Sequence, residues 1–230
     1  MKSFFLNRTF LLHLFAAAAL TSIFPAGTDL SKIYYEEGFS YLLQGNSAKA
    51  KEFLEKAVTE GGQYADPARL ELVRILSRSG NAQGLREMLG QFQDQNLVSA
   101  AWKEAILGLG DGGNSDASLE MALEMPLRFP VSPEADDVLF FSAELLFSRG
   151  QYAASLDRLQ MILTGYADKD CADDAYYLMS QIFLRPGPYF SPQRARGAVL
   201  AFHKNLDKPF FKDSLWKEEM DRLYLNERAF

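Results

Sequence analysis

The chain has 230 residues, of which 48% are hydrophobic, and carries a formal net charge of -6. This supplies enough apolar surface for a packed core, which excludes an intrinsically disordered chain. The acidic balance excludes the clustered basic surface of a nucleic-acid-binding protein and disfavours binding to anionic lipid.

Residues 1–26 have the pattern of a secretory signal. The first eight residues carry two positive charges, and residues 9–24 form a nearly continuous apolar run with four consecutive alanines. The cleavage position stays open between Ala19, Ser22 and Ala26. An uncleaved membrane anchor is the alternative, because the run is only slightly shorter than the roughly 20 residues that span a bilayer. We expect an exported protein of the periplasm or cell envelope, in contact with a membrane only if this segment is retained.

Two parts of the remaining chain repeat each other at an offset of 37 residues. Ala135 and its two following aspartates correspond to Ala172 and the two aspartates after it, and a glycine fifteen residues further on has a counterpart as well. Self-similarity at such a period is typical of stacked supersecondary units that cannot bury their apolar faces alone.

Glycines at similar spacing extend the repeat into five units. They are Gly45, Gly80, Gly113, Gly150 and Gly187, at spacings of 35, 33, 37 and 37 residues. Large, mostly apolar side chains stand eleven and four residues before each glycine, and mostly small ones stand seven before it. Because separations of three, four and seven are helical, each unit is predicted to be two amphipathic helices joined by a turn with a left-handed glycine.

Polar residues are predicted to cap these helices. Asp66, Ser132 and Ser191 each precede a proline, as expected at a helix start, and Asn81 and Ser115 can cap second helices. The predicted units span about 30–63, 65–97, 99–130, 132–167 and 170–208.

A last helix is predicted over about 212–228. It presents Leu215, Trp216, Met220 and Leu223 at helical spacing, and it would cover the open end of the repeat array.

The order of residue types in each unit resembles the tetratricopeptide repeat. The first unit matches that pattern at Gly38, Tyr41, Gly45, Ala50 and Ala57. The fourth and fifth units look like repeats of bacterial envelope proteins of the barrel-assembly lipoprotein and cell-division coordinator type, although no cysteine is placed to accept a lipid. The resemblance implies an all-α, right-handed superhelical solenoid over residues 27–230, and a role in binding a partner.

In that family the first helices of successive units line a concave groove. The corresponding residues here are Tyr35, Phe39, Leu70, Arg74, Lys103, Asp137, Phe140, Glu144, Asp174, Tyr177 and Gln181. Their aromatic rings, with positive charge in the middle and negative charge toward the C-terminal half, suit an extended or helical peptide. The alternatives are packing between adjacent units for the aromatic residues, and interaction with a helix N-terminus for the two aspartates.

No catalytic site, metal site or cofactor is predicted. Cys171 is the only cysteine, and His203 is the only histidine outside the signal segment, so a zinc-type cluster cannot be assembled from them. Residues 108–113 have the glycine spacing of a dinucleotide loop, but a helix precedes them where a strand is needed. Adjacent acidic residues such as Asp136 and Asp137 point about 100° apart on a helix and do not face each other across a bond.

The sequence therefore predicts a non-enzymatic scaffold or adaptor that binds another protein or peptide in the bacterial cell envelope. An accessory to a cell-wall-acting enzyme, or such an enzyme itself, is the alternative and would require carboxylates that converge across the groove. A small-ligand carrier would require the groove to close into a pocket. The partner and the oligomeric state are not specified by the sequence.

Overall fold

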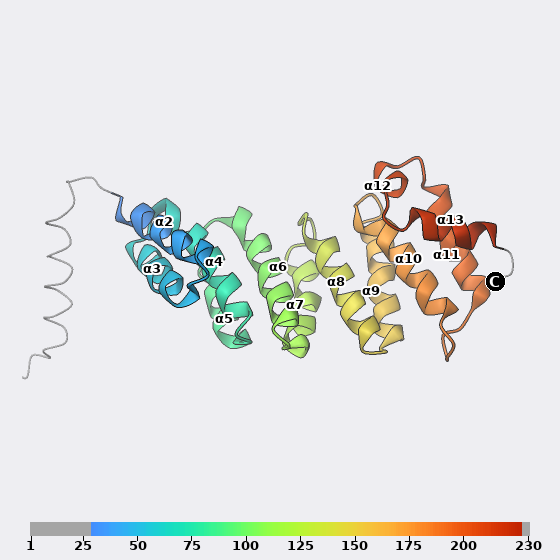
Figure 1. The fold of residues 1–230 in the computed structure, drawn as a ribbon, viewed down its shortest axis with the longest axis horizontal. Helices are drawn as coiled ribbons and strands as arrows, with labels where there is room; N and C mark the ends of the chain where they lie inside the picture. Colours follow the sequence, from blue (N-terminus) through green and yellow to red (C-terminus); the bar gives the residue numbers. More distant parts are fainter. Residues whose placement is uncertain (1–28, 227–230) are drawn as a thin grey trace, which may run out of the picture. The chain divides into compact units, whose positions relative to one another are not determined.

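The computed structural model describes residues 29–226, and every regular element in this range is helical. These residues form twelve α-helices and one short 3-10 helix, with no strand among them (Figure 1). The all-α prediction is confirmed. The predicted signal segment and the last residues of the predicted final helix lie outside the described residues.

The chain divides into two compact units, and the boundary falls inside a helix between Ala68 and Arg69. The first unit contains α2 (Leu30–Leu43), α3 (Ser47–Glu60), η1 (Gly62–Tyr64) and the start of α4 (Ala65–Ser77). Its two long helices pack along each other, and η1 contacts α2. A β-carbon on Gly38 would lie 2.8 Å from Leu54 Cγ, so the absence of a side chain there allows the close approach of the two helices.

The second unit continues through helical hairpins in chain order (Figure 1). Its elements after α4 are α5 (Ala82–Leu89), α6 (Gln95–Asp111), α7 (Ser115–Arg128), α8 (Ala135–Ser148), α9 (Tyr152–Gly165), α10 (Cys171–Leu184), α11 (Pro192–Lys204), α12 (Pro209–Lys212) and α13 (Lys217–Leu225). The main pairs are α6 with α7, α8 with α9 and α10 with α11. Helix α8 also contacts α6 and α7, and α10 contacts α8 and α9. Each hairpin therefore packs against the one that follows it in sequence.

Four of the predicted turn glycines have the left-handed conformation. The φ angles are 73° for Gly45, 75° for Gly80, 85° for Gly113 and 72° for Gly150. In three of these turns the residue after the glycine donates its N–H to the carbonyl oxygen four residues before the glycine, which terminates the first helix. Gly187 differs, with a φ of 150°, because α10 has already ended at Leu184 and an irregular segment of bends and a turn, with two prolines, follows it.

Buried hydroxyl groups tie the two helices of a hairpin together. Ser118 Oγ on α7 donates to the carbonyl oxygen of Ile106 on α6 at 2.7 Å. Ser155 Oγ on α9 donates to that of Ala143 on α8 at 2.8 Å. Both serines stand five residues after a turn glycine, and both carbonyls stand seven residues before it. Two units of different sequence therefore contain the same hydrogen bond at equivalent positions.

Interactions between hairpins recur near the repeat offset. Asn114 donates to the carbonyl oxygen of Gly80 at 2.9 Å, across 34 residues of sequence. Arg185 donates to the hydroxyl of Tyr152 at 2.8 Å, across 33 residues. Residues one repeat apart are therefore neighbours in the second unit.

Two of the predicted helix caps are confirmed. The Ser191 side chain accepts the N–H of Arg194 and Pro192 follows it, and the Asn81 side chain accepts the N–H of Gly84. Asp66 lies within the first turn of α4 and does not precede the helix.

Two other predicted caps are wrong. Helix α8 begins only at Ala135, because the Ser132 hydroxyl accepts the N–H of Glu134 in a local turn at 3.1 Å. Ser115 is the first residue of α7 and follows the capping residue Asn114, whose side chain bonds to the preceding hairpin.

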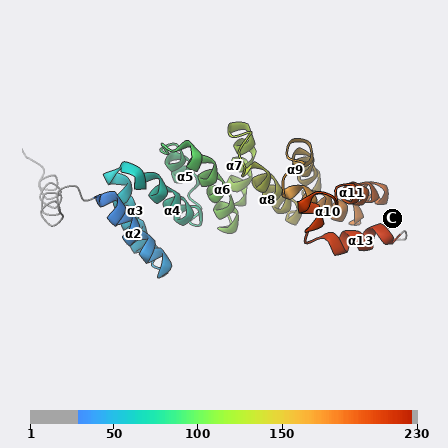
Figure 2. The same ribbon diagram turned by 90° about the horizontal axis from the view of Figure 1, so that it is seen from above.

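The predicted final helix over 212–228 is also wrong in its start. Lys212 ends the short helix α12, and α13 begins at Lys217 after an irregular turn. The side chain of Met220 on α13 is buried with Phe202 of α11 and Phe211 of α12. As Figure 2 shows, α13 runs beside α10 and α11, so this segment covers the last hairpin of the second unit.

None of the helices between residues 29 and 226 combines the length and the apolar composition needed to cross a bilayer.

Candidate functional site

All eleven predicted groove residues keep part of their surface accessible. In the first unit, Tyr35 and Phe39 form an aromatic pair on α2, with ring centroids 6.2 Å apart. Tyr35 also contacts Tyr64 at 5.6 Å, whereas the Phe39 side chain is 40% exposed. Phe39 is thus the aromatic residue that this unit presents to solvent.

In the second unit, the first helices α6, α8 and α10 form a cavity of ≈ 320 Å³. Five of the predicted groove residues line it: Lys103, Asp137, Phe140, Glu144 and Asp174. They come from three successive hairpins, so the structure brings together residues that the repeat register selected. Leu107, Phe141, Asp170 and Cys171 complete the lining.

The lining of this cavity is acidic. Lys103 Nζ forms an ion pair with Asp137 across adjacent hairpins. Burial acts against the charged amine, but the hydrogen bond to Asp137 together with the charges of Asp137 and Glu134 more than offsets it, so the pKa of Lys103 is raised. One of the lining carboxylates, Asp137, is paired with this lysine, and three further acidic side chains line the same cavity as Phe140: Glu144, Asp170 and Asp174.

Tyr177 and Asp174 contact the chain's own C-terminal segment. The Trp216 ring stacks on Tyr177 with centroids 3.9 Å apart and an angle of 4° between the planes. Its Nε1 donates to Asp174 Oδ1 at 2.6 Å. One face of the Tyr177 ring is therefore covered by Trp216. Tyr177 was predicted to be open to a partner, and that face of its ring is not.

Asp174 is partly withdrawn from water by the same segment. Burial, together with the neighbouring Asp173 carboxylate, raises the pKa of Asp174 to about 6, although the hydrogen bond from Trp216 acts in the opposite direction. This carboxyl group therefore titrates in mildly acidic solution.

The remaining predicted residues of the second unit lie outside this cavity. Leu70 packs against the core around Trp102. Arg74 bonds to Glu71 at 2.7 Å and to Glu104 on the next first helix at 3.0 Å. Leu70 and Arg74 therefore contribute to packing between hairpins. Gln181 is partly exposed on α10.

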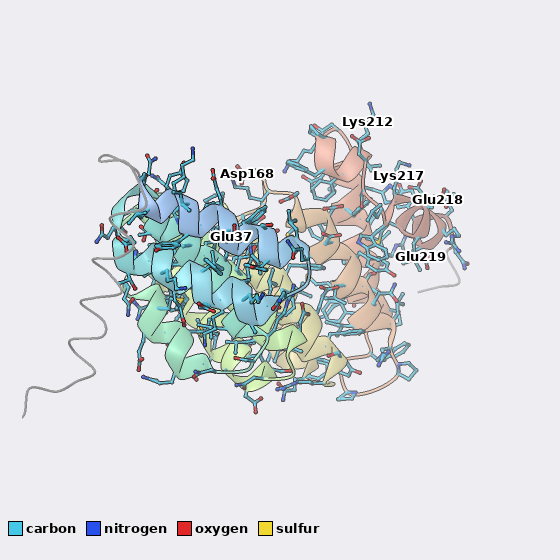
Figure 3. All side chains as sticks on the ribbon, turned by 60° about the vertical axis from the view of Figure 1, so that its left-hand side comes forward. Glu37, Asp168, Lys212, Lys217, Glu218 and Glu219 are labelled. Atoms are coloured by element: carbon cyan, nitrogen blue, oxygen red, sulfur yellow. The ribbon has the colours of Figure 1, made fainter. Side chains whose placement is uncertain are left out.

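Asp136 and Asp137 point into different surroundings, as expected for neighbours in a helix. Asp137 lines the cavity, whereas Asp136 is 1% exposed. Burial, with the charges of Asp137 and Asp170, raises the pKa of Asp136 to about 6. A further pair of adjacent acidic residues, Glu218 and Glu219, lies on α13 at the C-terminal end of the second unit (Figure 3).

Between residues 29 and 226, one group of side chains could hold a metal ion. Ligand atoms of Asp136, Asp170 and Cys171 all lie within 4.8 Å of one another. Burial and the surrounding carboxylates raise the pKa of the Cys171 thiol. Sequence reasoning missed this group because Asp136 and Cys171 are almost one repeat apart in the sequence. The stacking of repeat units could have indicated it, because residues about one repeat apart lie on adjacent helices.

A larger cavity of ≈ 770 Å³ lies between α9, α10 and α11. Leu156, Met179 and Phe183 supply apolar walls, and Asp157 and Arg194 supply charges. Sequence reasoning missed this cavity as well, and its signal is the irregular segment with two prolines before α11.

No protein-family model matches the chain, and no curated protein matches its sequence. Fold and site together define an all-α protein of helical hairpins that carries an acidic and aromatic cavity on the first helices of its second unit.

Proposed function

We propose that this protein is a non-enzymatic scaffold of the bacterial cell envelope that binds a protein or peptide through the first helices of its repeats. The observation that supports this most is the cavity on α6, α8 and α10. It combines the Phe140 ring, one lysine and four carboxylates on a surface built from three hairpins. An aromatic anchor surrounded by charges is typical of a peptide-binding surface.

The charge of the cavity defines the partner's chemistry. Glu144, Asp170 and Asp174 outnumber the single cation Lys103, which is paired with Asp137. A basic peptide with an apolar residue for the Phe140 ring satisfies both features.

We further propose that the hairpins form a right-handed superhelix of the tetratricopeptide type. The left-handed turn glycines, the contacts between successive first helices and the interactions across 33 and 34 residues of sequence support this arrangement. A superhelix of this kind would place the first helices on its concave side.

The proposed location is the periplasm or the cell-envelope space. Its support is the composition of residues 1–26, with two positive charges before an apolar run. Cell fractionation tests it: export predicts protein in the envelope fraction, and protein confined to the cytosol would contradict it.

The binding role can be tested by comparative affinity capture. Wild-type protein, a Phe140→Ala/Glu144→Gln variant and a Leu127→Ala variant are used to capture proteins from envelope extract, followed by quantitative mass spectrometry. Leu127 is 82% exposed on the second helix α7 and serves as the matched control. We expect a partner that is retained by wild type and by Leu127→Ala and lost by the double variant. Equal recovery with all three proteins would contradict the assignment.

A cell-wall-acting enzyme remains the second candidate, because four carboxylates line one cavity. Glycoside hydrolysis uses two carboxyl groups that face each other across the scissile bond. Incubation of the purified protein with peptidoglycan separates the two functions: the scaffold releases no glycan, whereas glycan release that Asp174→Asn abolishes would establish the enzyme.

A further inference from the structure

Three side chains that can bind a cation meet where α8 adjoins α10. Asp136 lies in the first turn of α8, Asp170 precedes α10, and Cys171 is the first residue of α10. Their ligand atoms lie within 4.8 Å of one another. In a tetrahedral zinc site the ligand atoms are about 3.5 Å apart, so a contraction of about 1 Å would complete the geometry.

The Asp136 carboxylate provides an independent reason to expect a ligand. Its side chain is 1% exposed, and neither oxygen accepts a hydrogen bond from a cationic side chain among the described residues; the side chain that interacts with it is the Asp170 carboxyl group, itself one of the three ligands. Its sequence neighbour Asp137 is paired with Lys103, and Asp174 accepts the Trp216 N–H. A buried carboxylate without such a partner is unfavourable, and a bound cation would offset this cost.

The donor set selects the class of cation. Ca²⁺ and Mg²⁺ prefer sites made of oxygen ligands, whereas Zn²⁺ accepts both thiolate sulfur and carboxylate oxygen. Cys171 is the only cysteine, so an intramolecular disulfide does not compete for its sulfur. Asp137 Oδ1 lies 3.6 Å from Cys171 Sγ and accepts the thiol proton.

The site has a route to solvent. Asp170 is exposed, and both Asp170 and Cys171 line the cavity on the first helices. An ion can therefore reach Asp136 from this cavity without opening the core.

We propose that Asp136, Asp170 and Cys171 bind one Zn²⁺ ion, with water as the fourth ligand. On binding, the S–H bond of Cys171 breaks, its sulfur forms the bond to zinc, and the proton passes to solvent; no group is oxidised or reduced. The ion links the first helices of two successive hairpins and stiffens their junction. This role does not depend on the proposed binding of a peptide.

The test is a titration of the purified full chain with Zn²⁺ by calorimetry and with Co²⁺ by absorbance. We expect saturation at one ion per chain, a thiolate-to-cobalt charge-transfer band and a higher unfolding temperature. Cys171→Ser is expected to remove the band, and Asp170→Asn to weaken binding more than about tenfold. Asp116→Asn is the control, because that side chain is 90% exposed and paired with Arg149 elsewhere on the surface.

The Asp136→Asn variant shows whether the buried charge of Asp136 is neutralised by a bound cation or by a proton. Without metal this variant should be at least as stable as wild type, because an amide replaces an unpaired buried carboxylate, and zinc should no longer stabilise it. Absence of saturable binding, or binding that survives both Cys171→Ser and Asp170→Asn, would overturn the proposal. A cobalt complex without the charge-transfer band would overturn the assignment of the sulfur ligand. Since Asp170 is exposed, its variant stays informative even if a buried substitution prevents folding.

Discussion

Trp216 makes two contacts of different kinds with α10. Its ring lies flat on Tyr177, and its N–H bonds to Asp174 at 2.6 Å. The first contact buries apolar surface, and the second holds a partly buried carboxyl group. One side chain thus attaches the C-terminal segment to the last hairpin.

Substitutions at Trp216 should separate these contributions. Trp216→Phe keeps a ring but removes the donor, and we expect a loss of about 1–2 kcal/mol in the free energy of unfolding. Trp216→Ala also removes the stacked ring and should cost about 3 kcal/mol or more. Urea unfolding measures both. Equal stability of the two variants would show that the stacking contributes nothing.

The raised pKa of Asp174 predicts a pH dependence of stability. Burial shifts this pKa from its ordinary value to about 6. The folded state therefore holds the proton more tightly than the unfolded state, so this contribution is fully present at low pH and is lost as the pH rises through about 6. Unfolding free energies of wild type and Asp174→Asn are compared between about pH 4 and about pH 7. Wild type should lose stability relative to the variant over this range, and a constant difference would contradict the shift.

The helix ends show which local signals are reliable. Four of the five turn glycines, with Ser191 and Asn81, act as predicted, because their roles depend only on the chain immediately around them. Ser132 fails because its hydroxyl group has an alternative partner two residues away, and α8 starts later.

The final helix was mispredicted for a different reason. Leu215 fits the apolar spacing of a helix that continues to Met220, yet its side chain is 91% exposed and lies in the turn before α13. A turn followed by a short helix satisfies the same spacing at Trp216 and Met220. Periodicity alone does not distinguish the two arrangements.

Two glycine-to-alanine substitutions test the role of the turns. Gly150 has a φ of 72° with open space around it, so Gly150→Ala should cost about 1–2 kcal/mol from the backbone alone. Gly197 lies inside α11, also with open space, and Gly197→Ala should stabilise by about 0.5–1 kcal/mol. Both are measured by chemical unfolding. If Gly150→Ala were no less stable than Gly197→Ala, the left-handed turn would not determine where α8 ends.

At the scale of the whole second unit, the repeat period predicted which residues are in contact between hairpins better than local sequence patterns predicted where the helices begin and end. Residues about one repeat apart are in contact, as with Lys103 and Asp137, and five predicted groove residues share one cavity. The period could not predict what the non-repeating C-terminal segment covers. The repeat period therefore could not predict that Trp216 stacks on Tyr177, nor that the chain divides into two units within α4.

The most direct test of the central claim is a fluorescence titration of the purified protein with short labelled peptides. The peptides place basic residues around one apolar residue, and matched peptides carry acidic residues instead. The account predicts saturable binding of basic peptides only, weakened by added salt because the cavity charges are screened. Phe140→Ala should weaken it about tenfold or more, and Leu127→Ala should leave it unchanged. Equal binding of acidic and basic peptides, or full binding by Phe140→Ala, would contradict the account.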